Sequence, residues 1–132
     1  MGTTDAKEAL TRARKQLERV QMAAWEPQDP EEAVTWAFYA YENALKALAE
    51  ARGDILARHH GRKAEYAGRM ARQKVLRTDA EARLVELNGL RKQVSYGDVY
   101  GDLAALDLED LASELETFLD EVETVIARGG VL

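Results

Sequence analysis

The chain has 132 residues, of which 46% are hydrophobic and 32% are charged, and its formal net charge is −6. This length supports one hydrophobic core and is short for two, so we expect a single domain over residues 1–132. The absence of cysteine excludes disulfides, thiolate metal sites and cysteine nucleophiles. No apolar run approaches the roughly 20 residues that span a bilayer, and no signal-like segment opens the chain, so we expect a cytoplasmic protein without membrane association.

Charge is distributed unevenly along the chain. Residues 98–132 contain ten acids and one base, whereas residues 52–77 contain eight bases and two acids. The two segments could face each other or solvent. Alternatively, the basic segment could form a rim for RNA or nucleotide phosphates while the acidic one points elsewhere.

The first half of the chain predicts two long helices. Asp5 and Glu8 have the spacing of a capping box, and apolar residues then recur every three or four positions to about residue 24. Asp29 is a second N-cap, followed by Pro30 at a first-turn position that suits proline. Gly53 is a natural terminator for this second helix.

The second half predicts a short helix over residues 64–70 and two longer ones. Thr78 and Glu81 form a capping box for a helix that Gly97 closes, and residues 98–105 are expected to be a loop. Asp107 caps the last helix, which ends at Gly129-Gly130 and whose apolar positions alternate by three and four: Leu108, Leu111, Leu115, Phe118, Val122 and Val125. No segment has the alternating pattern of a strand. The sequence therefore predicts an all-α fold, an antiparallel bundle of four to five helices with short loops.

The second helix is expected to be central. It is apolar over more than half of its circumference, and its repeated alanines allow neighbouring helices to approach closely. These apolar positions are Ala33, Ala37, Ala40, Tyr41, Ala44 and Leu48. The remaining arc is polar and includes Tyr39, Glu42 and Asn43.

Arg91 is unusual because it falls on the apolar stripe of the fourth predicted helix, between Leu87 and Val94. A guanidinium is always charged, and burying it without a partner is costly. Glu42 is the best counter-charge in the chain, so we predict that the second and fourth helices are neighbours and that Arg91 contacts Glu42. That pair could be purely structural; an acid of a second subunit or a ligand phosphate are other partners for Arg91.

The motifs of common cofactor sites are missing. There is no glycine-rich phosphate loop, paired-histidine metal motif or nucleophile elbow, so we expect no cofactor. His59 and His60 are adjacent and cannot share one helix face, so no metal site is expected. One of them could act in acid–base chemistry, or the pair could simply be exposed at a helix start.

The second helix reads AFYAYENALKALAEARG over residues 37–53, a histidine segment follows at His60, and residues 87–98 read LNGLRKQVSYGD, with an Arg and a Tyr-Gly-Asp. With these motifs in this order, residues 29–98 resemble the HEPN superfamily of small helical domains. The resemblance implies a HEPN-like bundle. In ribonuclease members, an Arg is followed after four to six residues by a His, in a cleft between two subunits. Arg91 matches that Arg, and Tyr96 stands where the His is expected.

The departure at Tyr96 bears on catalysis. Tyrosine has an ordinary pKa near 10 and is a poor general base at neutral pH, but it can stack on a base. The pattern resembles a branch of the superfamily with Tyr-Gly after the Arg, encoded alone or beside a nucleotidyltransferase.

Three functional interpretations follow from the resemblance and the residues. The preferred one is a non-catalytic homodimer that binds RNA, a nucleotide or a partner protein such as a nucleotidyltransferase-like or antitoxin protein, in a toxin–antitoxin or defence module. Its ligand-binding residues would be Arg91, Glu42, Tyr39, Asn43 and Tyr96. The second is a metal-independent ribonuclease that uses Arg91 with Tyr96 or His60. The third is a helical adaptor in which Arg91 is structural and the acidic last helix is the contact surface.

Overall fold

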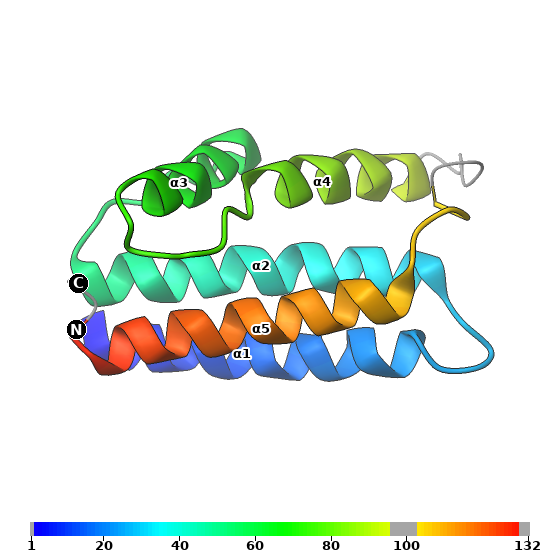
Figure 1. Ribbon diagram of the computed structural model, residues 1–132, viewed down its shortest axis with the longest axis horizontal. Helices are drawn as coiled ribbons and strands as arrows, with labels where there is room; N and C mark the ends of the chain where they lie inside the picture. The colour runs from blue at the N-terminus through cyan, green and yellow to red at the C-terminus, as the bar shows by residue number, and fades with distance from the viewer. Residues whose placement is uncertain (1, 96–102, 130–132) are drawn as a thin grey trace.

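The computed structural model describes residues 2–95 and 103–129, and within them every regular element is a helix. The five helices are α1 Gly2–Ala23, α2 Pro30–Arg52, α3 His60–Arg72, α4 Glu81–Ser95 and α5 Leu108–Ala127. Helices α1, α2 and α5 pack against one another, and α3 and α4 follow each other along another side of α2 (Figure 1). The prediction of an all-α fold is confirmed. No helix in the described ranges is long and apolar enough to cross a membrane.

The four longer helices alternate in direction along the chain. Helices α1 and α4 run opposite to α2 and α5, so α2 and α5, the second and fourth of these helices, run in the same direction (Figure 1). Ala47 near the end of α2 and Ile126 near the end of α5 accordingly pack in one cluster with Ala6 and Ala9 of α1. This alternation is the arrangement expected of an antiparallel bundle, with the two-helix unit α3–α4 returning the chain to the end where α2 began.

Helix α2 is the centre of the bundle, as its composition predicts. It contacts each of the other four helices. The alanines at 37, 40 and 44 are fully buried. Side chains of this size let α1 and α5 lie close to the α2 backbone, and Glu42 of the polar arc faces α3.

Local capping chemistry sets several helix ends where expected. The Asp29 side chain accepts a hydrogen bond from Glu32 N at 3.2 Å, and the Asp107 side chain accepts one from Asp110 N at 3.0 Å. Gly53 ends α2 in the left-handed region at φ 77°, which glycine tolerates because it has no Cβ.

Both predicted capping boxes are wrong. Helix α1 begins at Gly2, so Asp5 lies inside its first turn instead of capping it. Helix α4 begins at Glu81, whose N–H donates to Asp79 Oδ1 at 3.0 Å. The N–H of Thr78 instead donates to Glu121 of α5, so a tertiary contact replaces the local cap. Helix α3 is also longer than the predicted 64–70, and Gly97 lies outside the described residues.

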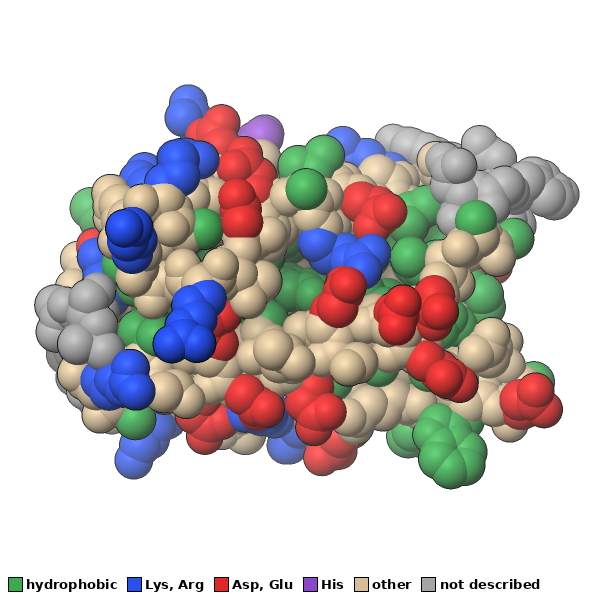
Figure 2. Space-filling view, in the orientation of Figure 1, with side chains coloured by type: hydrophobic (Ala, Val, Ile, Leu, Met, Phe, Trp, Pro, Cys, Tyr) green, Lys and Arg blue, Asp and Glu red, His purple; other side chains and the backbone are tan. Residues whose placement is uncertain are grey.

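The acidic and basic segments do not neutralise each other. Among the described residues, the acids of α5 pair with bases from α1 and α4: Asp120 and Glu123 with Arg14, and Glu114 with Arg83. On the face shown in Figure 2, basic side chains gather at the left and acidic ones at the centre and right. On this face, positive and negative charge therefore remain largely apart.

Candidate functional site

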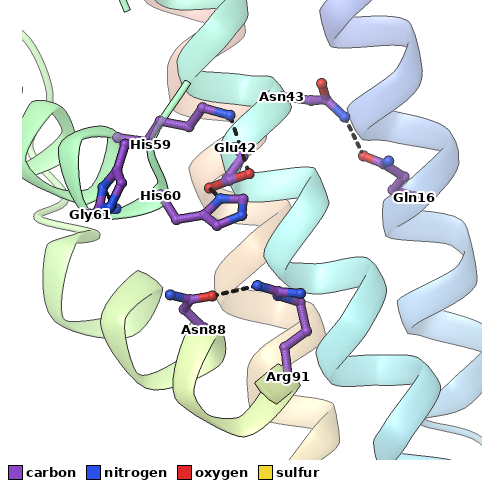
Figure 3. Close-up of polar contacts among 9 residues, drawn as sticks. Gln16, Glu42, Asn43, His59, His60, Gly61, Asn88 and Arg91 are labelled. Carbon is purple, nitrogen blue, oxygen red and sulfur yellow. Dashed lines mark hydrogen bonds and ion pairs between the residues drawn. The ribbon is translucent and has the colours of Figure 1, made fainter. Parts of the chain in front are cut away.

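Glu42 is the one buried charged residue in the described part of the chain, and it is held by two bases of α3. Its side chain is 7% exposed, with Oε2 2.7 Å from Nδ1 of His60 and Oε1 3.4 Å from Nζ of Lys63. His60 and Lys63 are three residues apart and therefore share a face of α3. Figure 3 shows His60 pointing toward Glu42 across the α2–α3 contact.

These contacts have a clear electrostatic reason. A buried carboxylate is costly unless it is paired and hydrogen-bonded, and Lys63 supplies the opposite charge. The bond to Glu42 also fixes the orientation of the His60 ring, since the carboxylate accepts at Nδ1 and Nε2 is left for another partner. The His60 side chain is 39% exposed, so a ligand can reach it.

Phe38 connects this pair to α4. Its ring is almost fully buried in α2 and meets the His60 ring edge-on, with centroids 5.1 Å apart. The guanidinium of Arg91 lies over the same Phe38 ring at 4.9 Å. Phe38, Glu42, His60, Lys63 and Arg91 therefore form one group, hereafter the α2–α3–α4 cluster.

The predicted Arg91–Glu42 ion pair is not formed. Helices α2 and α4 are neighbours as predicted. However, Arg91 lies over Phe38, which is one helical turn before Glu42. The Glu42 carboxylate instead contacts His60 and Lys63 of α3. Its Nη2 donates to Asn88 Oδ1 at 2.8 Å, as Figure 3 shows. Its Nε is buried without a hydrogen-bond partner, and no described carboxylate lies within ion-pair distance of it.

The other predicted site residues are distributed around a groove. This groove, of about 400 Å³, lies between α2, the segment after it and α3; Tyr39, Glu42, Asn43, His60 and Lys63 contribute to its lining. Tyr39 also packs edge-on against Phe38, with centroids 5.5 Å apart. Tyr96 lies outside the described residues.

Asn43 and His59 have structural contacts. Asn43 Nδ2 donates to Gln16 Oε1 at 2.9 Å and so links α2 to α1 (Figure 3). His59 caps α3, because its Nδ1 accepts from Gly61 N at 3.1 Å. The two adjacent histidines thus have different roles, one as a helix cap and one in the cluster.

A hydrogen-bonded group holds the segment between α2 and α3 at the groove. Asp54 Oδ2 accepts from Arg52 Nε at 2.9 Å and from the Tyr66 hydroxyl at 2.7 Å. The bond to Arg52 holds the pKa of Asp54 below its ordinary value. Burial, and then the bond to Asp54, raises the pKa of Tyr66. Both groups therefore keep the ionisation states that this network requires.

Sequence reasoning missed Lys63 and Asn88. Each lies three residues from a predicted site residue, His60 and Arg91 respectively, so helical spacing could have indicated both. Within the described part of the chain, no group of three or more His, Asp or Glu side chains could hold a metal ion.

Comparisons with models of known families, with curated proteins and with solved structures find no match for this chain. The HEPN resemblance therefore rests on its sequence motifs alone.

Proposed function

We propose that the α2–α3–α4 cluster binds a phosphate group of RNA or of a nucleotide, in a non-catalytic HEPN-like domain. The observation that carries the proposal is Arg91: a half-buried guanidinium with one donor unused and no carboxylate partner among the described residues. Such a group costs free energy unless something satisfies it. A phosphate supplies both a negative charge and several acceptors for a guanidinium.

The charges around Arg91 favour an anion. The cluster contains two cations, Lys63 and Arg91, and one carboxylate, Glu42, so it has an excess positive charge even when His60 is neutral. The groove beside it includes the partly buried ring of Tyr39, a surface on which a base can stack. Together these features fit a nucleotide unit better than a free inorganic anion.

RNA binding can be measured by fluorescence anisotropy with a labelled single-stranded RNA of mixed sequence, at several salt concentrations. We expect salt-sensitive affinity, and Arg91→Ala should weaken it and lower the salt slope by about one. Exposed Arg12 of α1, which has no ion pair with a described residue, gives the control: Arg12→Ala removes the same charge away from the cluster. Equal losses in the two variants would reduce the effect to net charge and contradict a site at Arg91.

A second candidate function is metal-independent ribonuclease activity, and the Glu42–His60 bond favours it. A histidine oriented by a carboxylate can accept a proton from a ribose 2′-hydroxyl, while Arg91 stabilises the charge that develops on the phosphate. We would incubate the protein with total RNA in EDTA and compare His60→Ala, Arg91→Ala and Arg12→Ala. Absence of cleavage at high protein concentration, or cleavage that persists in the first two variants, excludes this function.

The HEPN resemblance also leads us to propose a homodimer and a protein partner of the nucleotidyltransferase-like or antitoxin kind. Light scattering at high micromolar protein tests the dimer. If the protein binds neither RNA nor nucleotide, and Arg91→Ala only lowers stability, Arg91 is structural and the domain is a helical adaptor.

A further inference from the structure

Two large apolar side chains are exposed where α1 turns into α2. Trp25 is 77% exposed and Met22 is 75% exposed. The backbone that carries them is held by hydrogen bonds, from Trp25 N to Met22 O at 3.1 Å and from Asp29 N to Ala23 O at 2.8 Å. A defined turn therefore presents the indole to solvent.

A groove of about 510 Å³ lies between this turn and α5. Trp25, Ala24 and Ala112 contribute apolar lining, and Glu26 and Glu109 contribute carboxylates; we call these five residues the Trp25 groove. At the right of Figure 2, where α5 begins and the α1–α2 turn lies in Figure 1, acidic side chains gather and no basic ones are seen.

The two carboxylates differ from three acids further along α5. Asp120, Glu123 and Glu114 each pair with an arginine. Glu26 and Glu109 have no ion pair with any residue that the structure describes. The Trp25 groove thus combines exposed apolar surface with negative charge that lacks a counter-ion.

A second tryptophan, Trp36, contacts both a guanidinium and a carboxylate. The guanidinium of Arg19 lies over the Trp36 ring at 4.6 Å, and Trp36 Nε1 donates to Glu32 Oε2 at 2.6 Å. Indole, carboxylate and guanidinium are all present there. Trp25 has the indole and the neighbouring carboxylates, but no described cation lies over its ring.

We propose that the Trp25 groove binds a basic, partly apolar segment of a partner protein. An arginine or lysine of that segment stacks on the Trp25 indole and pairs with Glu26 and Glu109, and its apolar neighbours cover the alanines of the groove. The phosphates of RNA would meet the same two carboxylates and be repelled. This surface is therefore separate from the α2–α3–α4 cluster and does not rest on the function proposed for it.

The test uses a dye-labelled, end-capped peptide of alternating arginine and leucine, titrated with the full chain and followed by anisotropy. Matched peptides carry glutamate or glutamine in place of arginine. We expect the arginine peptide to bind best, and Trp25→Ala or the double variant Glu26→Gln/Glu109→Gln to weaken it about fivefold or more. Val85→Ala, at an exposed apolar position on α4, is the control and should bind like the wild type.

Several results would overturn the proposal. No binding at millimolar peptide, or binding that Trp25→Ala leaves unchanged, removes the site. If Trp25→Ala instead abolishes a concentration-dependent dimer seen by light scattering, the occupant is a second copy of the chain. If Trp25→Ala abolishes RNA binding, the surface belongs to RNA. Because these substitutions are at exposed positions, circular dichroism should show the wild-type helix content throughout.

Discussion

Nδ1 of His60 lies 2.7 Å from Oε2 of Glu42, a carboxylate that is nearly removed from solvent. Lys63 approaches the other oxygen of this carboxylate, and a carboxylate can only accept hydrogen bonds. The hydrogen of this bond therefore resides on His60. One residue earlier, the same nitrogen of His59 has the opposite role, because it accepts from the N–H of Gly61.

The two histidines should consequently have different tautomers. At a pH where both rings are neutral, we expect the hydrogen on Nδ1 in His60 and on Nε2 in His59, since each partner dictates what Nδ1 must do. Long-range ¹H–¹⁵N correlation spectra distinguish the two forms. Glu42→Gln, which weakens the constraint on His60 alone, should shift the His60 signals and leave those of His59 in place. Identical tautomers in the wild type would contradict the assigned contacts.

Glu42→Gln should also destabilise the fold, by about 1–3 kcal/mol, because Lys63 and His60 then lose a buried charged partner. Urea unfolding measures this as a lower midpoint at unchanged slope. Glu50→Gln is the matched control: Glu50 lines the same groove from α2, and its side chain has no ion pair with a described residue. A loss as large in Glu50→Gln would show that groove charge in general, and not the Glu42 contacts, stabilises the domain.

Asp54 predicts a pH dependence of stability. Its pKa is lowered in the folded protein, chiefly by the hydrogen bond from Arg52, so its ionised form contributes stability above its ordinary pKa of about 4. That contribution is lost as the pH falls through the lowered folded-state pKa. Asp54→Asn should cost at most about 1 kcal/mol at neutral pH, since the site is partly solvated. The difference from wild type, measured by thermal unfolding, should shrink toward acid pH; a constant difference would contradict the linkage.

Two glycines should respond to alanine in opposite ways. Gly53 has φ 77°, so Gly53→Ala strains the end of α2 and should destabilise by about 1 kcal/mol. Gly89 lies inside α4, and the methyl group of an alanine there would meet no neighbouring atom within 4 Å, so Gly89→Ala should stabilise by roughly 0.5–1 kcal/mol. Denaturant midpoints of the two variants provide the comparison. Stabilisation of both would mean that the left-handed cap at Gly53 is not required.

Much of the fold could be read from local patterns. The caps at Asp29 and Asp107 act within a single turn of helix, and the apolar positions of α5 repeat with the helical period, which is why the sequence predicts both correctly. The predicted cap at Thr78 is wrong because Glu121, more than forty residues away, accepts from its N–H. The side of α2 on which the α3–α4 unit packs escapes prediction for a similar reason, because it depends on contacts between elements far apart in the chain.

The site shows the same division. The sequence by itself determined that α2 has a polar arc with Glu42, that Arg91 falls among apolar residues, and that His60 lies near the start of a helix, because these follow from the order of residues at helical spacing. Only the tertiary structure decided which charge meets which. Whether Glu42 pairs with Arg91 of α4 or with His60 and Lys63 of α3 depends on where each helix lies along α2, and in the structure α3 and α4 both contact the Phe38 ring of α2.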